Sequence, residues 1–599
     1  MKRALLITSL MAATALSAAP VSAQGETTEA CQPETKPRSA ADKKFEEIST
    51  AEYDWRVGEM APNEDSPASA EATLPDVGPK RQAEKLARWT DTLKALDALD
   101  VAALSPANKV NYEVYRQQIE SLLAEQKYHE YEKPMTADTS FWGDVAGWTR
   151  GTFSTAADYE NYIAMMQQIP RYYDQQIVNM RAGLKRGFTA PKITLQGRDS
   201  EIAAVVDAKS IAASPFYAPF ETMPDIIPAA KQAELRQQAQ EAIRKDVVPA
   251  HQKLLTFMRT EYLPGARTSL AAYDLPDGKA YYRSKIREFV TLDKSPEEIH
   301  QIGLDEVAKI KARMFDVMKQ VNFQGTLPEF LTFLRTDPQF YVKKPQDLLD
   351  RAAWIAKMFD AVSGDYFGRL PRRRFAIKPV PAAIAPYYTG GRGGPGIYLV
   401  NTYDLPSRPL YSLPALTLHE SAPGHAMQMP LAAENKDLPA FRRDTYISAY
   451  GEGWALYSEA LGEEMGIYQT PYEVFGMLSY QMWRAARLVV DTGIHTQGWT
   501  REQAQQYLLN NTALSKHEVT TEVDRYIAWP GQALSYYMGE LTILQDRAKA
   551  EKALGEKFNI RAFHDAVLEL GSVPLPVVTQ RVDQFIKDGG VGPYPDEEK

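Results

Sequence analysis

Residues 295–314, SPEEIHQIGLDEVAKIKARM, show the pattern that decides the fold of this 599-residue chain. Ser295 is a typical N-terminal cap, Pro296 suits the first helical position, and Glu298 can complete a capping box. Apolar residues then recur mostly at intervals of three and four, as on the buried face of an amphipathic helix. They are Ile299, Leu304, Val307, Ile310 and Met314. The stretch therefore predicts a helix that packs one face against the rest of the protein.

The same periodicity extends along the chain in both directions and predicts a mostly α-helical protein. It covers residues 83–99, 109–127, 156–188 and 230–263, and then 413–429, 441–466, 470–497, 501–510, 519–526, 531–552 and 560–571. Residues 375–381 and 397–401 instead predict two strands of a small sheet. The glycine-rich residues 390–396 lack the ending of a phosphate loop, so we expect a flexible turn or a cleft-lining loop there.

The first 23 residues are typical of a cleavable secretory signal. Lys2 and Arg3 precede an apolar stretch, and small residues lead up to Ala23. The stretch is too short to span a membrane, so we expect a soluble periplasmic or secreted protein with no membrane partner after cleavage. The single cysteine, Cys31, excludes an intrachain disulfide. It also lacks the preceding residues of a lipid-modified cysteine, which favours a free protein over a lipoprotein.

Charge and composition suggest how the rest of the chain is organised. The net charge of −9 argues against a nucleic-acid partner. Residues 24–40 are polar, and we expect them to form a disordered linker. A helical N-terminal region is expected over residues 41–330, and a second region over 331–599, with their lobes merged into one unit around a cleft. The sequence leaves the oligomeric state open.

Residues 416–425, LTLHESAPGH, carry the side chains with the clearest chemistry. Neutral histidines such as His419 and His425 can bind zinc, while an adjacent glutamate such as Glu420 acts on water. The usual spacing of these histidines is four, but here it is six, or about 240° around a regular helix. The Pro423–Gly424 step can break the helix and bring the rings together. The alternative is a buried, hydrogen-bonded histidine pair.

Two glutamates follow in residues 450–459, YGEGWALYSE. Glu452 and Glu459 are seven residues apart, so they share one helical face with aromatic and small residues. Carboxylates in apolar surroundings are costly unless they are paired or bind a metal. The alternative is a pair of solvated acids, the usual fate of glutamates on helices.

Together these motifs resemble the bacterial family called domain of unknown function 885, which is grouped with the gluzincin clan of zinc metallopeptidases. The resemblance extends over nearly the whole mature chain and includes residues 74–76 (LPD), 489–495 (VVDTGIH) and 530–536 (PGQALSY). It implies a largely helical, peptidase-like fold and a bound Zn²⁺, and it does not fix a substrate. We therefore expect a mostly α, gluzincin-like fold, with a large helical two-lobed cleft and a small β-sheet near the metal site.

The resemblance also implies roles for the residues of both motifs. His419 and His425 are expected to be metal ligands together with Glu452, since residues 452–455 (EGWA) are also similar to a zinc-ligand segment of aminopeptidase-N-type enzymes. Glu459 is then a group that supports a ligand, or the alternative ligand. Glu420 is expected to be the general base and afterwards the acid.

Two further residues and one strand are candidates for substrate chemistry. His495 can donate to an oxyanion if Asp491, four residues earlier, orients it; the alternative is a structural ladder of charges and hydrogen bonds. Tyr536 is our choice for a hydroxyl that stabilises a tetrahedral intermediate. The strand at residues 397–401 is a candidate for pairing with the substrate backbone.

The sequence thus predicts a zinc metallopeptidase that cleaves the peptide bonds of short peptides. An amidase or esterase that uses the same metal on a non-peptide substrate is one alternative. A metal-free periplasmic peptide-binding protein that retains the fold is another. A metal-free glycosidase that uses Glu452 and Glu459 as paired acids is the least favoured.

Overall fold

The computed structural model describes residues 39–59, 73–382, 385–443 and 445–596. These residues form a mostly α-helical protein with one small three-stranded sheet, as the periodicity predicts. The expected signal, residues 1–23, and nearly all of the expected linker, residues 24–40, lie outside the described residues.

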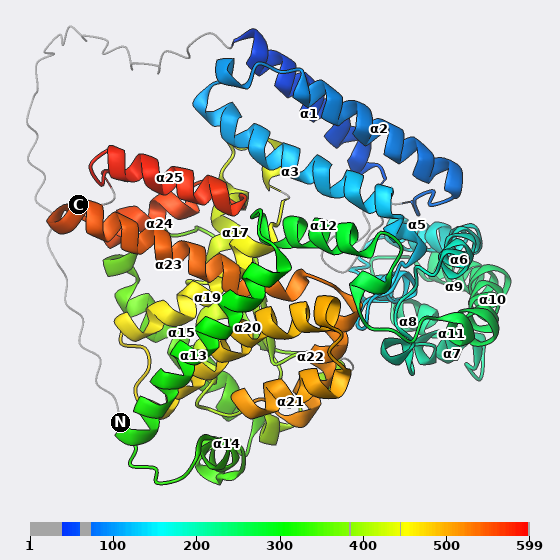
Figure 1. Ribbon diagram of the computed structural model, residues 1–599. Coiled ribbons are helices and arrows are strands. Elements are labelled where there is room, and N and C mark those ends of the chain that lie inside the picture. The colour runs from blue at the N-terminus through cyan, green and yellow to red at the C-terminus, as the bar shows by residue number, and fades with distance from the viewer. Residues whose placement is uncertain (1–38, 60–72, 383–384, 444, 597–599) are drawn as a thin grey trace, which may run out of the picture.

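The N-terminal helices form two groups (Figure 1). The first group is a layer of three helices, α1 (Ala40–Val57), α2 (Pro79–Asp97) and α3 (Pro106–Tyr128). The second group surrounds its own apolar core and contains α4 (Phe141–Gly147), α5 (Ala156–Met166), α6 (Ile169–Arg186), α7 (Ser200–Val206), α8 (Ala218–Glu221), α9 (Ala229–Ala242), α10 (Val248–Phe257) and α11 (Leu263–Gly265). The helix expected over residues 156–188 is therefore two helices, α5 and α6.

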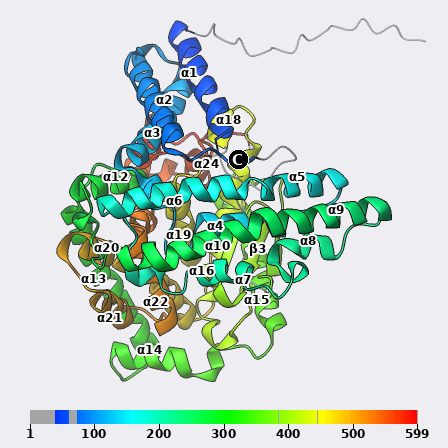
Figure 2. The same ribbon diagram turned by 90° about the vertical axis from the view of Figure 1, so that its right-hand side faces the viewer.

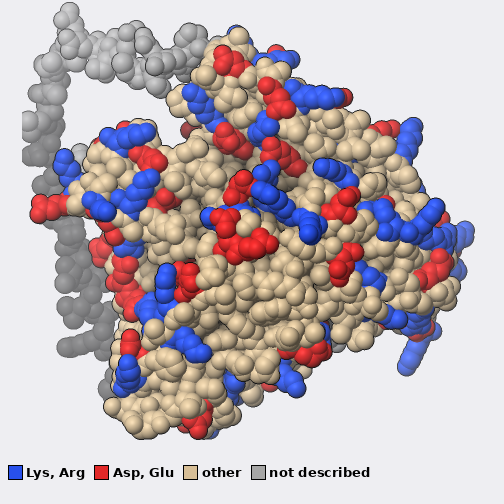
Figure 3. All heavy atoms as spheres, viewed as in Figure 1, with Lys and Arg blue, Asp and Glu red and all other residues tan. Residues whose placement is uncertain are grey.

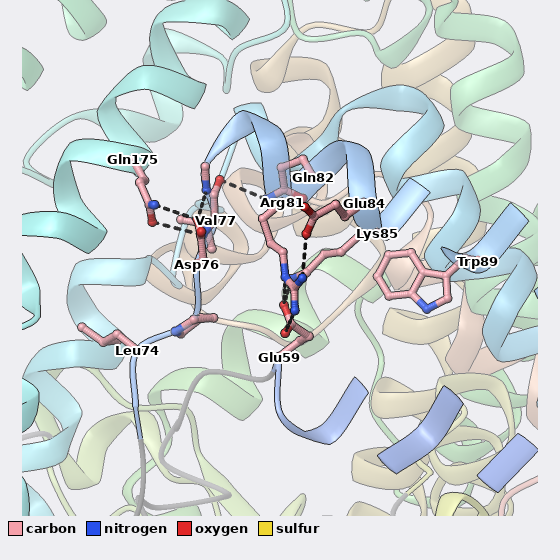
Figure 4. A network of polar contacts seen from close by, with 12 residues as sticks. Glu59, Leu74, Asp76, Val77, Arg81, Gln82, Glu84, Lys85, Trp89 and Gln175 are labelled. Atoms are coloured by element: carbon pink, nitrogen blue, oxygen red, sulfur yellow. Dashed lines mark hydrogen bonds and ion pairs between the residues drawn. The ribbon is translucent and has the colours of Figure 1, made fainter. Parts of the chain in front are cut away.

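A short segment before α2 joins these two groups (Figure 4). The side chain of Gln175, on α6, accepts a hydrogen bond from Val77 N at 3.1 Å and donates one to Asp76 Oδ1 at 2.7 Å. Arg81, on α2, donates from Nε to Glu59 Oε2 at 2.9 Å, which ties α2 to the end of α1. These polar contacts fix the three-helix layer against the second group.

The main body contains the remaining helices, which lie below the N-terminal layer in Figure 1. They are α12 (Gly278–Val290), α13 (Pro296–Gln320), α14 (Leu327–Thr336), α15 (Pro345–Tyr366), α16 (Leu413–Glu420), α17 (His425–Glu434), α18 (Ala440–Arg443), α19 (Ser448–Glu464), α20 (Pro471–Gln497), α21 (Arg501–Asn511), α22 (Lys516–Ala528), α23 (Ser535–Leu554), α24 (Ile560–Leu568) and α25 (Leu575–Lys587).

Helix α13 begins where the sequence predicts, with Ser295 and Glu298 forming a capping box. It packs along α20, and a Cβ atom on Gly303 would lie only 2.7 Å from Leu488 Cβ, so the two helices come very close. Residues 330 and 331, where the two expected regions meet, lie inside α14.

The sheet consists of β1 (Ala376–Pro379), β2 (Gly391–Gly394) and β3 (Ile397–Val400), in the order β1-β3-β2. Strand β3 pairs in parallel with β1 and in antiparallel with β2. The glycine-rich segment that we expected to be a flexible turn therefore contains an edge strand, β2. Since β3 is paired on both sides, the prediction that this strand binds substrate by edge pairing is wrong.

Figure 2 shows the sheet beside α16, with the helices of the second N-terminal group in front. Acidic and basic side chains are interspersed over the face seen in Figure 3. In the described part of the chain, no helix has the length and apolar character needed to cross a membrane.

Candidate metal centre

The helix expected over residues 413–429 is broken, and the break brings the two motif histidines together. Helix α16 ends at Glu420 and α17 begins at His425. Gly424 N donates to Leu418 O at 3.0 Å, and a Cβ atom on Gly424 would lie 1.9 Å from His419 O. Only glycine therefore fits this tight return of the chain. The ring centroids of His419 and His425 are 4.9 Å apart, with the ring planes at 86°. The predicted break at Pro423–Gly424 is confirmed.

Glu452 of α19 lies between the two rings. Its Oε2 atom is 3.5 Å from His419 Nε2 and also 3.5 Å from His425 Nε2. Two ligands at zinc bond lengths of about 2.0–2.1 Å in a tetrahedral arrangement are separated by roughly 3.4 Å. The two separations from Glu452 Oε2 to the histidine Nε2 atoms are therefore close to the spacing of neighbouring zinc ligands, and imidazole nitrogens with a carboxylate are a donor set that zinc accepts.

Glu459, two helical turns after Glu452, supports His419 from the other side. Its Oε1 accepts a hydrogen bond from His419 Nδ1 at 2.7 Å, and the residue is fully buried. Histidine ligands usually donate their second ring N–H to such a carboxylate. The geometry thus separates the two glutamates: Glu452 faces the Nε2 atoms, where a metal would lie, and Glu459 orients the His419 ring.

The electrostatics of the cluster favour positive charge. Burial alone would lower the pKa of His419, but hydrogen bonds to Glu452 and Glu459 and the charge of Glu420 raise this pKa to about 10. Burial alone would raise the pKa of Glu452, but the charge of His425 and hydrogen bonds from the two histidines hold it well below its usual range. The buried carboxylates therefore create a strongly negative environment, which suits a bound cation.

Glu420 is placed by the edge strand of the sheet. It is the last residue of α16, and its Oε2 accepts a hydrogen bond from Gly393 N, on β2, at 2.6 Å. One ligand-type atom from each of His419, Glu420 and His425 lies within 4.8 Å of the others. A Cβ atom on Gly393 would lie 1.7 Å from Glu420 O, so glycine is needed for this close approach. The carboxylate is thus held beside the histidines by a strand that sequence analysis did not identify.

Tyr446 is a site residue that sequence reasoning missed. Its hydroxyl donates to Glu452 Oε1 at 2.9 Å, and its ring centroid is 6.4 Å from that of His425. Although the residue as a whole is 44% exposed, desolvation of its hydroxyl and the charge of Glu452 raise its pKa well above the ordinary value, so it remains a donor. A Cβ atom on Gly451 would lie 2.4 Å from the Tyr446 ring, so Gly451 makes room for it. Gly451, next to Glu452 in the sequence, was the residue that could have indicated a large side chain packed beside Glu452.

The structure places Tyr536 in a different set of contacts. Its hydroxyl accepts a hydrogen bond from Arg525 Nη2 at 3.2 Å, and the Arg487 guanidinium lies 4.3 Å from its ring centroid. Its role in stabilising an intermediate stays a prediction.

The structure does not bring His495 to the metal-site cluster. His495 Nδ1 accepts from Ala272 N at 3.1 Å, and Nε2 donates to Tyr526 O at 2.9 Å. Asp491 accepts from the Tyr282 hydroxyl at 2.6 Å and does not orient His495 as expected. Because both ring nitrogens are already engaged in a fully buried position, this histidine fits the structural alternative and not donation to an oxyanion.

The fold and the cluster define a mostly helical protein in which two histidines and three glutamates lie together, namely His419, His425, Glu420, Glu452 and Glu459. The chain belongs to the family described as bacterial protein of unknown function (DUF885), whose model matches residues 58–582.

Two solved structures are similar to this chain over most of its length. A crystal structure of a candidate lipoprotein from Colwellia psychrerythraea has 27% identity and a TM-score of 0.83, covering 91% of this chain and 98% of that one. A candidate lipoprotein of unknown function from Shewanella oneidensis has 18% identity and a TM-score of 0.66, covering 90% and 99%. The second likeness shows the fold alone. No curated protein matches the chain.

Proposed function

We propose that this protein is a zinc-dependent hydrolase that cleaves the peptide bonds of short peptides. The observation that carries the proposal is the position of Glu452 Oε2, 3.5 Å from both histidine Nε2 atoms, with Glu420 beside them. The resemblance of both motifs to gluzincin metallopeptidases supports the same function.

His419, His425 and Glu452 would hold the metal, and the residues around them would fix the ligands. Glu459 orients the His419 ring through Nδ1, and Tyr446 holds the second oxygen of Glu452. When bound, zinc would act as a Lewis acid that polarises the substrate carbonyl and makes water more acidic.

Glu420 would carry the proton during hydrolysis. Its carboxylate takes a proton from the attacking water and then gives it to the leaving amine, so that one group serves as base and acid. The hydrogen bond from Gly393 N at 2.6 Å holds one carboxylate oxygen in place, and the other oxygen is the one we assign to this proton.

The substrate backbone would pair with the outer edge of β2. Asn401 N donates to Gly390 O at 3.0 Å, so the alternate residues Gly391 and Gly393 direct their backbone groups away from β3. Since Gly393 N already donates to Glu420, a substrate would pair with the remaining groups of this edge. An extended peptide added at this edge would pass close to Glu420. Edge pairing, which we first expected on residues 397–401, is therefore proposed for β2.

The comparisons also support export from the cytoplasm. The solved structure with 27% identity is of a candidate lipoprotein, a class of exported protein. This agrees with the secretory signal that the first 23 residues predict, and we propose that the protein acts in the periplasm or the medium.

Metal analysis combined with two variants tests the proposal. We expect about one zinc ion per wild-type chain and its loss in His419→Ala, because a site with one ligand removed binds zinc far more weakly. Glu420→Gln should keep the zinc and lose at least ~100-fold in peptide hydrolysis. The control is Glu463→Gln, at a side chain that is 45% exposed.

Three outcomes would count against the proposal. Turnover retained in Glu420→Gln would exclude the proposed base. A wild-type protein that takes up no metal when zinc is supplied would favour the metal-free binding protein. Hydrolysis of esters or other amides, with no peptide cleaved, would favour the alternative metal-dependent hydrolase.

A further inference from the structure

A cavity of about 250 Å³ lies between α14, α16, α20 and the start of α22, about one to two helical turns along α16 from Glu420. Leu413 and Leu416 of α16 form part of its wall, and so does Gly390, directly before β2. Leu413, Leu416 and Glu420 are spaced by three and four residues, so they share one face of the helix. Gly393, which binds Glu420, is three residues after Gly390. The two elements that place Glu420 therefore both continue into the wall of this cavity.

The separation between Glu420 and the cavity corresponds to a short piece of peptide. Four residues of helix from Leu416 to Glu420 rise about 6 Å, and three residues of strand from Gly390 to Gly393 span about 10 Å. An extended peptide advances about 3.3–3.6 Å per residue. A substrate bound along β2 would reach the cavity with a residue two or three positions from the bond that is cut.

The cavity is positively charged, although the whole chain has a net charge of −9. Its lining contains three cationic side chains, Arg335, Arg408 and Lys516, and one carboxylate, Glu518. Glu518 is already engaged, because its Oε2 accepts a hydrogen bond from Ser515 N at 2.9 Å in the capping box of α22. The other walls are largely apolar and aromatic, as in a typical binding site with a few orienting polar groups.

Arg408 is the largely buried cation with unused hydrogen-bonding capacity, whereas Lys516 is exposed to solvent. Arg335 donates to Thr512 O at 2.7 Å, which occupies part of its guanidinium. Arg408 Nη1 makes only long contacts, 3.4 Å to Ser407 O and 3.8 Å to Glu518 Oε1. Its Nε atom is buried and has no hydrogen-bond partner among the described residues. With its side chain only 14% exposed, Arg408 can bind a carboxylate in a partly desolvated setting.

We infer that this cavity binds a carboxylate of the peptide substrate through Arg408. The carboxylate is either the C-terminus of the peptide or the side chain of an aspartate or glutamate, two or three residues from the bond that is cleaved. The inference rests on the proposed function and adds a substrate class to it: peptides with an acidic group on one side of the scissile bond.

Peptide binding in the full-length, zinc-supplied protein tests this inference. In the Glu420→Gln background, which should bind without turnover, fluorescence anisotropy would give the Kd of labelled peptides. One pair of peptides differs only in a free or amidated C-terminus, and a second pair differs only in glutamate or glutamine. Arg408→Gln should weaken binding of the carboxylate peptide roughly 10- to 100-fold and leave its neutral partner unchanged.

Two additional variants serve as references. Arg408→Lys keeps the charge but loses the paired N–H geometry, so it should restore part of the preference. Arg244→Gln changes an arginine that is 59% exposed and pairs with Glu241 elsewhere, so it should behave like the parent protein. Thermal unfolding of each variant shows whether the fold is retained.

The outcomes separate the inference from the proposed function. The pair of peptides that responds identifies the C-terminal or the side-chain carboxylate as the ligand. An unchanged carboxylate preference in Arg408→Gln, or no preference in the parent, would overturn the inference while peptide hydrolysis still stood. If no peptide is bound or cleaved, the proposed function and the inference both fail.

Discussion

The support that Glu459 gives to His419 leads to a quantitative prediction for Glu459→Gln. This substitution keeps the shape of the side chain and an oxygen that can accept from His419 Nδ1, but it removes the negative charge. In the wild type that oxygen lies 2.7 Å from Nδ1 and 3.7 Å from Arg484 Nη2, and the residue is fully buried. The charge therefore acts on the ring and on the arginine without screening by solvent.

The expected effect on zinc binding follows from this position. Loss of a carboxylate that orients a ligand typically costs about 10- to 100-fold in metal affinity, or about 1.4–2.8 kcal/mol. A second effect concerns Arg484, which is buried and otherwise contacts the rings of Tyr480 and Trp483. The 3.7 Å separation between Arg484 Nη2 and Glu459 Oε1 exceeds hydrogen-bond length, so the substitution removes a charge interaction of Arg484. We therefore expect the free energy of unfolding to fall by about 1–3 kcal/mol.

Competition with a chelator of known affinity would measure zinc binding, and urea unfolding of the metal-free protein would measure stability. Glu463→Gln is the matched control, because this residue lies four positions further along α19, is 45% exposed and pairs with Arg313. Zinc affinity that is unchanged in Glu459→Gln would refute the supporting role. Complete loss of zinc in Glu459→Gln, with full retention in Glu452→Gln, would show that the two glutamates have the opposite roles.

Two further substitutions, Gly393→Ala and His251→Gln, test the edge strand and one buried histidine. Gly393→Ala places a Cβ atom 1.7 Å from Glu420 O, so peptide hydrolysis should fall at least ~10-fold and the free energy of unfolding by about 1–3 kcal/mol. Gly394→Ala is the control, because its Cβ atom enters open space and should change neither quantity. Equal losses in the two variants would contradict the close approach of β2 to Glu420. Burial lowers the pKa of His251 to about 4, below its unfolded value of 6.5, so between pH 6.5 and 4 only the unfolded state gains this proton. Urea unfolding should then show that the wild type loses about 1.4 kcal/mol of stability relative to His251→Gln for each pH unit as the pH is lowered through this range. His517→Gln, at an exposed histidine, is the control. A difference between wild type and His251→Gln that is constant with pH would disprove the prediction.

Sequence periodicity predicted the helices well because their apolar faces are local patterns. Helix α13 begins at its predicted cap, and α20, α21 and α22 lie within a few residues of their predicted positions, whereas the stretches expected as single helices over 413–429 and 441–466 each form two helices. Strand β2 could not be predicted in this way, since its sequence, GRGG, has neither alternation nor strand-forming residues. It is extended because β3 pairs with it and because α16 packs against it, and both partners come from tertiary structure.

The candidate site shows the same division between local and tertiary information. Both histidines and both glutamates were recognisable from their motifs, but a seven-residue spacing places Glu452 and Glu459 on one face and cannot assign their roles. The roles depend on how α19 crosses α16, which directs Glu452 to the Nε2 atoms and Glu459 to Nδ1. Tyr446 was missed because it fell inside the helix expected over residues 441–466. In the structure Tyr446 precedes α19, and its hydroxyl reaches Glu452.

The six-residue spacing of the histidines is explained by α19. A regular helix would hold both rings by itself at a spacing of four. Here the chain breaks between them, and Trp454 Nε1 donates to Pro423 O at 2.8 Å, so α19 also fixes the break. Thus the helix that carries Glu452 and Glu459 also helps to hold the break between α16 and α17 in place.

The position of α19 in turn depends on α23. A Cβ atom on Gly453 would lie 2.5 Å from Gly539 Cα, and one on Gly539 would lie 2.0 Å from Ala449 O. Helices can approach so closely only where a side chain is absent at the contact, so the two glycines let α19 pack directly against α23. Because Glu452 is the residue before Gly453, this contact also helps to hold Glu452 beside the two histidines.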